Sequence, residues 1–495
     1  MPSSIRFGNL RWFQRPIVTI FNRLSITKLK LSKFSSPEAS CCSDEDLCDF
    51  LPWLERKAGA EISSVLSIGK SAYGRDIGIV LPFDICHDCR SLFASKSIQT
   101  GDCMLKVPYS VQIAPDNLLP EINSLLPDEV GNVAKLAIII LAEQKLGQQS
   151  EWAPYISHLP RPGEIHNTIF WSEMELEMIK TSLVYQETIK KNLHIENEFL
   201  AVKPIFDYFP ETFDGIRFDG FRHAYALVES RAWISTRGVS LIPFADFLNH
   251  DGSAEAIVLS DEGKKHSEVS ASTPLSIYYC PCVIADREYE PGDQVVIRYG
   301  KFSNGTLLLD FGFTLRHNIY DEVQIQVNIP HHDPLWPKKL ELLQLHCTPA
   351  IENDNGFSSS QDSFKIKEVK SAKGRGRGIP QSLRAFARVL CLTSFEELSD
   401  LAVEAAQSDG RLARHPLKNK SREIEAHRFL LAQISRLMEE HSVSIESMGP
   451  PSSSVSFDKA ALRRRMARDL LTGELRVLKS ASDWLENYCA TLSEC

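Results

Sequence analysis

The stretch Leu241–His250, which reads Leu-Ile-Pro-Phe-Ala-Asp-Phe-Leu-Asn-His, decides the fold of this chain. It begins apolar, as a buried strand does, and it ends on the polar pair Asn249-His250. Phe244 and Phe247 precede the pair on both faces, so both polar side chains are expected inside. Burying an amide and an imidazole costs several kcal/mol unless each finds a partner. The sequence therefore predicts a ligand or a tightly satisfied local network at this point.

A second stretch, Asp293–Phe313, has the pattern of a strand followed by a helix. Its β-branched residues lead into Tyr299-Gly300. The chain then passes through Ser303-Asn304 into an apolar, helix-like run. In both stretches, polar side chains follow an apolar run: Asn249-His250 in the first, and Tyr299 and Ser303-Asn304 in the second. Both stretches are therefore candidates for one functional site.

Composition sets limits on the class of protein. A chain of 495 residues is too long for one core, so about two or three domains are expected. Its net charge of −9 argues against a surface that coats nucleic acid. The longest apolar run, Leu136–Ala142, is far too short for a membrane span. Twelve cysteines without a small-domain framework are expected to be mostly free thiols in a reducing compartment.

The N-terminal residues 1–37 contain seven Lys or Arg and several serines but no Asp or Glu. This composition is typical of an organellar transit peptide, and we expect residues 1–40 to be such a leader. A disordered basic tail is the alternative. Folded sequence is expected from Ser43.

Further along, the pattern is helical from Pro120 to Arg237, and strand-like sequence returns from Val239 to Tyr299. The polar stretch Ser260–Ser272 interrupts these strands. After a short strand at Phe364–Val369, nearly everything beyond Pro380 is helical. Three apolar stripes mark these C-terminal helices: Leu383, Phe386 and Leu390; Ile424, His427 and Leu431; and Leu462, Met466 and Leu470.

The pair Asn249-His250, followed by Tyr299-Gly300, resembles the two signature motifs of SET-domain protein methyltransferases, in the Rubisco large-subunit lysine methyltransferase-like branch of plant organelles. The resemblance covers roughly Ser43–Cys489. It implies an α+β fold in which a SET domain of small β-sheets with a pseudoknot occupies residues 43–320. A helical insertion is expected at about 120–235, and an all-α substrate-binding lobe at 321–490.

The same resemblance implies a function. It predicts an S-adenosylmethionine-dependent protein-lysine N-methyltransferase that acts on a non-histone protein. The protein is expected to be a monomer in the plastid, or alternatively in the mitochondrion, with no nucleic-acid or membrane partner. Two alternatives stay open: a protein-histidine methyltransferase, and a non-catalytic SET-fold scaffold in an organellar complex.

The resemblance also assigns residues to roles. Tyr299 corresponds to the catalytic tyrosine, while Trp233 and Phe302 line the substrate channel, although relatives usually carry Lys or Arg in place of Phe302. For Arg231 the alternative is a salt bridge to Glu229, and for Asn304 it is a plain helix N-cap. The residues expected to hold the cofactor are Ser91, Leu92, Phe93, Arg231, Asp246, Asn249, His250, Ser303 and Asn304.

One segment departs from the resemblance. Relatives carry a glycine-containing loop before the strand at Phe93, and here Ser91 stands where glycine is usual. Tyr73-Gly74-Arg75 is the natural lead-in to Ser91, so residues 76–90 are interpreted as an insertion that splits one loop. This insertion puts cofactor binding by this chain in question.

Three other patterns are expected to be structural rather than functional. Cys86, Cys89, Cys280 and Cys282 can be drawn as a zinc site, but free thiols are the default and no metal is predicted. The repeat Gly374–Gly378, Gly-Arg-Gly-Arg-Gly, is expected to be a flexible loop. Arg463–Arg465 and Arg468 are expected to form a solvated helix face.

Overall fold

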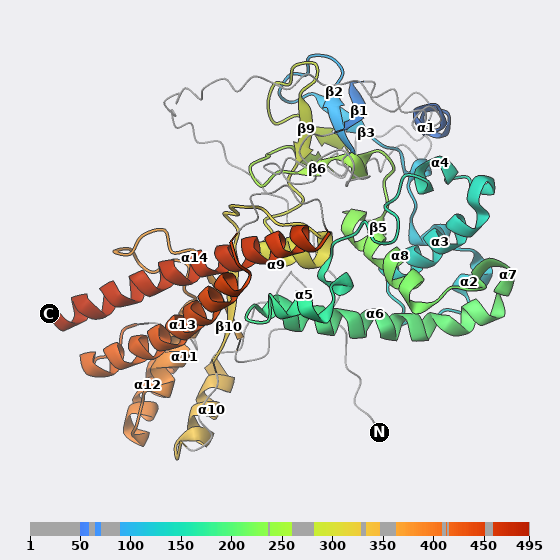
Figure 1. The fold of residues 1–495 in the computed structure, drawn as a ribbon. Coiled ribbons are helices and arrows are strands. Elements are labelled where there is room, and N and C mark those ends of the chain that lie inside the picture. The colour runs from blue at the N-terminus through green and yellow to red at the C-terminus, as the bar shows by residue number, and fades with distance from the viewer. Residues whose placement is uncertain are drawn as a thin grey trace. The chain divides into compact units, whose positions relative to one another are not determined.

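A computed structural model describes residues 50–58, 65–70, 90–235, 238–259, 282–327, 333–346, 363–407, 412, 415–450 and 459–494. The chain divides into two compact units. The first consists of the chain up to Ile165 and of Leu193–Gly300, and the second of His166–Asn192 and of Lys301 onward. Figure 1 gives the order of their elements.

Several of the expected features lie outside the described residues. These are the leader 1–40, the start of folding at Ser43, the polar stretch Ser260–Ser272, and the insertion 76–90 apart from Arg90. Among the helices that are described, none is long and apolar enough to cross a membrane.

The described strands of the first unit form small sheets. β1, β2, β9 and β6 form one sheet in that order, β3, β8 and β7 form another, and β4 pairs with β5. Their bounds are β1 Leu66–Lys70, β2 Arg90–Ala94, β3 Cys103–Lys106, β4 Trp233–Ser235, β5 Gly238–Ser240, β6 Asn249–His250, β7 Ile257–Leu259, β8 Cys282–Ile284 and β9 Gln294–Ile297.

The sheet β1-β2-β9-β6 is mixed. β2 is antiparallel to both β1 and β9, whereas β6 runs parallel to β9. A turn follows β2 at Gly101, whose φ of 92° favours glycine. The strand after this turn, β3, pairs with β8 rather than with β2, so the turn joins two sheets.

Buried apolar helices form part of the core of the first unit. The apolar run Leu136–Ala142 lies in α3, which is buried through most of its middle and packs against α8. Pro52 lies in the first turn of α1, where a missing N–H disturbs no helical hydrogen bond. The bounds are α1 Phe50–Ala58, α2 Pro120–Asn123, α3 Asn132–Leu146, α4 Ala153–Ile156, α7 Pro210–Phe213 and α8 Phe218–Arg231; α6, Leu183–Tyr208, belongs partly to each unit.

The second unit is mainly helical around one two-stranded sheet, β10 (Glu322–Gln326) with β11 (Ser363–Lys367). Its two long helices, α13 and α14, lie side by side (Figure 1). The helices are α5 Glu173–Glu177, α9 Asn304–Thr306 with the π-helical turn Leu307–Phe311, α10 Trp336–His346, α11 Gln381–Leu390, α12 Phe395–Gln407, α13 Lys420–Ser447 and α14 Lys459–Glu494.

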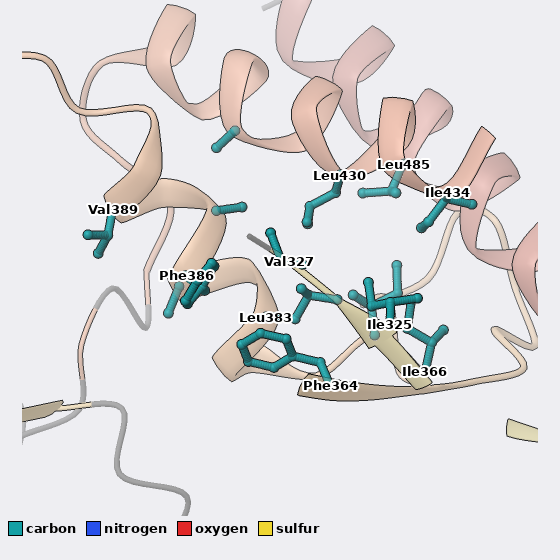
Figure 2. Close-up of a cluster of buried hydrophobic side chains, with 14 of the residues drawn as sticks. Ile325, Val327, Phe364, Ile366, Leu383, Phe386, Val389, Leu430, Ile434 and Leu485 are labelled. Carbon is teal, nitrogen blue, oxygen red and sulfur yellow. The ribbon is translucent and has the colours of Figure 1, made fainter. Parts of the chain in front are cut away.

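Figure 2 shows the core of this unit, in which the sheet faces α11, α13 and α14. Ile325 and Phe364 from the strands meet Leu383 of α11, Leu430 of α13 and Leu485 of α14. The labelled side chains converge from five elements, so the two strands are covered by one continuous apolar layer.

The apolar stripe of α13 differs from the expected one. Ile424 and Leu431 are half-buried, while Ala426, Leu430 and Ile434 are fully buried. The buried face is rotated because it also contains Glu423, which hydropathy alone places in water. His427 of the predicted stripe is buried, and Leu431 packs against the core, so the stripe differs only in part. Glu423 is buried because Arg388 pairs with its carboxylate, which outweighs the hydropathy pattern.

Two predictions about basic sequence are also corrected. Arg463 is 3% exposed and bonds the carboxylate of Glu175 at 2.7 Å and the carbonyl of Phe170 at 2.9 Å, so it is not on a solvated face. The Gly374–Gly378 repeat is fixed by hydrogen bonds to its neighbours, including one from Trp484 to Gly374.

Candidate functional site

Strand β9 brings the two parts of the candidate site together. On one side it pairs with β2, with Leu92 opposite Val295. On the other it pairs with β6, with Asn249 opposite Val296 and His250 opposite Ile297. β2 and β6, about 150 residues apart in the chain, therefore flank β9, and the motifs that contain Asn249-His250 and Tyr299 lie on neighbouring strands or at their ends.

Asn249 is almost fully buried, with 3% of its surface exposed. Its side-chain nitrogen Nδ2 has no hydrogen-bond partner among the described residues. A buried amide donor without a partner costs about 1–3 kcal/mol. This donor is therefore the feature of the site that a bound acceptor would satisfy.

His250 has a defined tautomer. Its Nδ1 accepts the backbone N–H of Tyr299 at 3.0 Å, so the ring proton lies on Nε2. Burial is the main cause that lowers the pKa of His250 from 6.5 to about 4. The ring is therefore neutral at neutral pH, and it ties β6 to the end of β9 without carrying charge.

Tyr299 is held from two directions. Its ring centroid lies 5.1 Å from that of His250, and its hydroxyl donates to the carbonyl of Leu248 at 2.7 Å. Because the phenolic proton points at Leu248, the lone pairs of this oxygen point elsewhere and can accept a hydrogen bond. The hydroxyl is thus set up as an acceptor beside Asn249.

The turn before Asn249 is strained and locally anchored. Phe244 has a φ of 76°, a conformation that non-glycine residues rarely adopt and that concentrates at functional sites. Two residues on, the carboxylate of Asp246 accepts the hydroxyl of Tyr155 at 2.8 Å in a buried bond. Sequence reasoning missed Tyr155, since it lies far away in the chain and no local pattern marks it.

Ser91, Leu92 and Phe93 lie in strand β2 and not in a loop, which corrects the expectation for this segment. Ser91 is fully buried, and its hydroxyl accepts a hydrogen bond from Nε2 of Gln294 at 2.7 Å. The glycine required by close packing is Gly69 of β1, where a Cβ would lie 2.8 Å from the ring of Phe93. Ser91, which stands where relatives are expected to carry glycine, therefore contacts β9 through the side chain of Gln294.

Arg231 ends α8 and is 7% exposed. Its Nη1 donates to the hydroxyl of Ser230 at 3.0 Å. Trp233 follows in β4, where it pairs with Ser240 and is half-buried. Both residues lie in the first unit, as do Asn249 and Tyr299.

Phe302, Ser303 and Asn304 belong to the second unit. Ser303 is the N-cap of α9, and its hydroxyl accepts the N–H of Thr306. Asn304 is the first helical residue, so the N-cap alternative for it was wrong. Its side chain instead bonds both backbone groups of Leu315, at 2.8 Å each, and its own N–H goes to Asp321 at 2.9 Å.

The buried ring of Phe302 stacks on Phe311, with centroids 5.7 Å apart. The side chains of Phe302, Ser303 and Asn304 are thus engaged within their own unit.

The part of the chain that the structure describes contains no group of three or more His, Cys, Asp or Glu placed to hold a metal. Cys282, one of the four cysteines considered for zinc, is paired with Cys103 across β3 and β8 as a disulfide, with Cα atoms 6.5 Å apart. The cysteines were expected to be mostly free thiols; among the described residues this pair is not, whereas Cys391 and Cys489 are. Cys86, Cys89 and Cys280 lie outside the described residues.

Comparison with solved structures identifies the fold. The structure matches one titled "Crystal structure of the SET domain of LSMT bound to Lysine and AdoHcy" with a TM-score of 0.68, at 20% identity over 91% of this chain and 92% of that one. These small sheets, one of which carries the Asn-His pair on β6 next to β9, are thus those of a SET-fold protein.

Sequence comparisons show which proteins the chain resembles. Residues 330–478 match the family described as Rubisco LSMT substrate-binding. The ribulose-1,5 bisphosphate carboxylase/oxygenase large subunit N-methyltransferase of Pisum sativum is 27% identical over 54% of this chain and 53% of its own length. The actin-histidine N-methyltransferase of Xenopus tropicalis is 24% identical over 81% of this chain and 67% of its own length.

The chain is thus similar in fold to SET-domain proteins, and in sequence to N-methyltransferases of the Rubisco large-subunit type. It spans about half the length of the plant relatives that it matches.

Proposed function

We propose that this protein is an S-adenosylmethionine-dependent protein N-methyltransferase whose acceptor is a lysine of a non-histone protein. The observation that carries the proposal is the buried amide of Asn249, left without a partner beside the His250–Tyr299 pair. The relatives named above, which are protein N-methyltransferases, support the reaction class.

The residues of the site suit this cofactor. The Nδ2 donor of Asn249 fits the ring acceptors of an adenine, and a neutral His250 holds the backbone on which Asn249 lies without adding positive charge near a sulfonium. Arg231 fits the carboxylate of the methionine part. The remaining cofactor assignments, Ser91–Phe93, Asp246, Ser303 and Asn304, stay part of the proposal.

When bound, that cofactor supplies a methyl group activated by a sulfonium. Methyl transfer to an amine then depends mainly on alignment of donor and acceptor. In the proposed mechanism the Tyr299 oxygen, whose proton is engaged by Leu248, accepts a hydrogen bond from the incoming amine and orients its lone pair. Trp233 and Phe302 are proposed to line the channel for the acceptor side chain.

The domain assignments follow the same proposal. Residues 43–320 form the SET domain and residues 321–490 the lobe that binds the protein substrate, which includes the matched segment 330–478. We place the protein in the plastid as a monomer, with residues 1–40 as its transit peptide; plant relatives named as chloroplastic support this location.

A second candidate acceptor is histidine. The frog relative named as an actin-histidine N-methyltransferase favours it. A neutral imidazole is, like an amine, a nitrogen nucleophile that needs alignment more than acid–base help.

Calorimetric titration with S-adenosylmethionine tests the cofactor assignment, and absence of binding would favour the non-catalytic scaffold. Incubation with methyl-labelled S-adenosylmethionine and a plastid protein extract then tests the reaction. Mass spectrometry of the labelled protein decides between lysine and histidine. Label on neither residue, despite cofactor binding, would refute the proposed activity.

A further inference from the structure

The loop after β11 combines a fixed backbone with a cluster of exposed cations. Between residues 370 and 378 it carries Lys370, Lys373, Arg375 and Arg377, all exposed, and no Asp or Glu. Within the described part of the chain, none of the four makes an ion pair at salt-bridge distance. In a protein whose net charge is −9, this is a local concentration of positive charge.

The backbone of this loop is held by α14. Nε1 of Trp484 donates to the carbonyl of Gly374 at 2.8 Å. Gly376 has a φ of 67°, and a Cβ there would lie 2.6 Å from the Trp484 ring, so only glycine allows this approach. The loop then returns to β11, where the N–H of Lys367 donates to the carbonyl of Gly378 at 2.9 Å.

Trp484 is itself immobilised. It is 2% exposed, it stacks on Tyr488 with ring centroids 5.0 Å apart, and the guanidinium of Arg384 lies 4.9 Å from its ring centroid. The glycines of the repeat therefore serve close packing on a buried tryptophan rather than flexibility. As a result, the side chains of Arg375 and Arg377 extend from a backbone that is held in place.

We infer that residues 370–378 form a docking surface for an acidic segment, rich in Asp and Glu, of the protein substrate. The inference rests on the proposed function, because the loop lies inside the segment 330–478 that matches the substrate-binding family. Exposed cations on an ordered loop attract carboxylates and lose less backbone freedom on binding than a mobile loop does.

The chemistry of the loop favours a protein over a nucleic acid. Proteins that bind single strands add aromatic platforms on which bases stack. Residues 370–378 contain no aromatic residue, and the adjacent tryptophan, Trp484, is buried beneath the loop. Guanidinium groups pair well with carboxylates in two-point hydrogen bonds.

The test uses the full chain and a fluorescein-labelled polyglutamate peptide, with binding followed by fluorescence anisotropy. Replacing both arginines, Arg375→Gln with Arg377→Gln, is expected to weaken binding about fivefold, since two exposed ion pairs are lost and each contributes only a small amount of binding free energy. Binding to the unchanged protein should also weaken as salt is raised. The paired change Arg375→Lys with Arg377→Lys keeps the charges and should retain most of the affinity.

The matched control is Lys420→Gln with Arg428→Gln, which removes two exposed cations from α13 of the same unit. It should leave the affinity for polyglutamate unchanged. An equal loss in the control, or no loss in the arginine pair, overturns the inference. Tighter binding of polyuridylate or of phosphatidylglycerol vesicles through the same two arginines would overturn it in favour of a nucleic acid or a membrane.

Titration of the same variants with S-adenosylmethionine separates the two proposals. The arginine variant should bind the cofactor as the unchanged protein does. If the unchanged protein fails to bind S-adenosylmethionine but still binds polyglutamate through Arg375 and Arg377, the proposed function fails and the acidic docking surface stands.

Discussion

Asn249 is the residue on which cofactor binding is expected to depend most directly. Asn249→Ala removes a buried side-chain donor that has no partner among the described residues, so a bound acceptor loses its hydrogen bond. We expect the affinity for S-adenosylmethionine to fall by about 1–3 kcal/mol in calorimetric titration. Asn487→Ala, on an exposed part of α14, serves as the control and should bind normally. Equal affinity in both variants would remove Asn249 from the site.

Tyr299 is expected to act on the rate of methyl transfer more than on binding. Tyr299→Phe keeps the ring against His250 and deletes only the oxygen that Leu248 orients. The rate with labelled cofactor should fall about 10²-fold or more, with little change in cofactor affinity. Loss of the hydrogen bond to Leu248 should lower the free energy of unfolding by about 1 kcal/mol.

Tyr109→Phe is the matched control for this change, because its hydroxyl bonds the exposed Asp116. It should leave the rate unchanged. A Tyr299→Phe variant that transfers methyl groups at the normal rate would show that the hydroxyl has no part in the reaction.

At the scale of elements, the register of β1 and β2 bears on residues 76–90. Lys70 at the end of β1 lies opposite Arg90 at the start of β2, so the ends of the intervening chain are already neighbours. Joining Arg75 to Ser91 puts an arginine back at the start of β2 and leaves a four-residue connection, a length common in hairpins.

We therefore expect deletion of residues 76–90 to leave the melting temperature similar or higher, because a shorter loop loses less entropy on closure. Ser91 and its neighbours should then be positioned more firmly, and the affinity for S-adenosylmethionine should rise. The two proteins are compared by parallel titrations. Weaker binding by the shortened protein would mean that the segment belongs to the site.

A buried ion pair links α11 to α13. Nε of Arg388 donates to Glu423 at 2.8 Å, and Tyr488 and the N–H of Leu417 donate to the same carboxylate at 2.9 and 3.0 Å. Both charged side chains are fully buried. Glu423→Leu leaves the Arg388 charge unpaired and should lower the free energy of unfolding in urea by about 3–5 kcal/mol.

The double variant, Arg388→Met with Glu423→Leu, removes both charges and should be more stable than the single variant, because no unpaired charge stays buried. A double variant that unfolds at a lower urea concentration than Glu423→Leu would contradict this expectation. It would mean that Arg388 stabilises the folded protein even without its carboxylate partner.

At the scale of the whole molecule, burial lowers the pKa values of several of the described histidines. It is the largest cause that lowers the pKa values of His166, His250 and His427 from 6.5 to about 4. Because the folded pKa is below the unfolded one, the stabilisation is present above pH 6.5 and is lost as the pH falls to about 4. Each histidine should contribute up to about 3 kcal/mol of this loss.

Protonation of Asp321 has the opposite effect on the free energy of unfolding. Burial raises the pKa of its carboxyl from 3.8 to about 7, so protonation in that interval stabilises the folded state. Melting temperatures measured from pH 7 to pH 4 should fall, and they should fall more gradually in His427→Gln, which cannot titrate. If the melting temperature of His427→Gln falls with pH as steeply as that of the unchanged protein, His427 is not held neutral in the folded protein.

The order of residues along the chain was sufficient to predict the class of fold and to locate the two central motifs. Apolar sequence ending on Asn249-His250 predicted a buried polar pair, and helical periodicity predicted α3, α8, α11 and α14. Such inferences succeed because burial imposes a period of about 2 residues on strands and 3.6 on helices, which is written along the chain.

Tertiary structure alone decided which residues meet. The partners of Asp246 and Glu423, namely Tyr155 and Arg388, lie far from them in sequence, and no local pattern marks these pairs. The glycine repeat around Gly376 predicted a flexible loop, but its backbone is fixed because Trp484 packs against it. The physical reason is common to all three: hydrogen bonds, ion pairs and close packing act through distance in space, whereas a sequence records only distance along the chain.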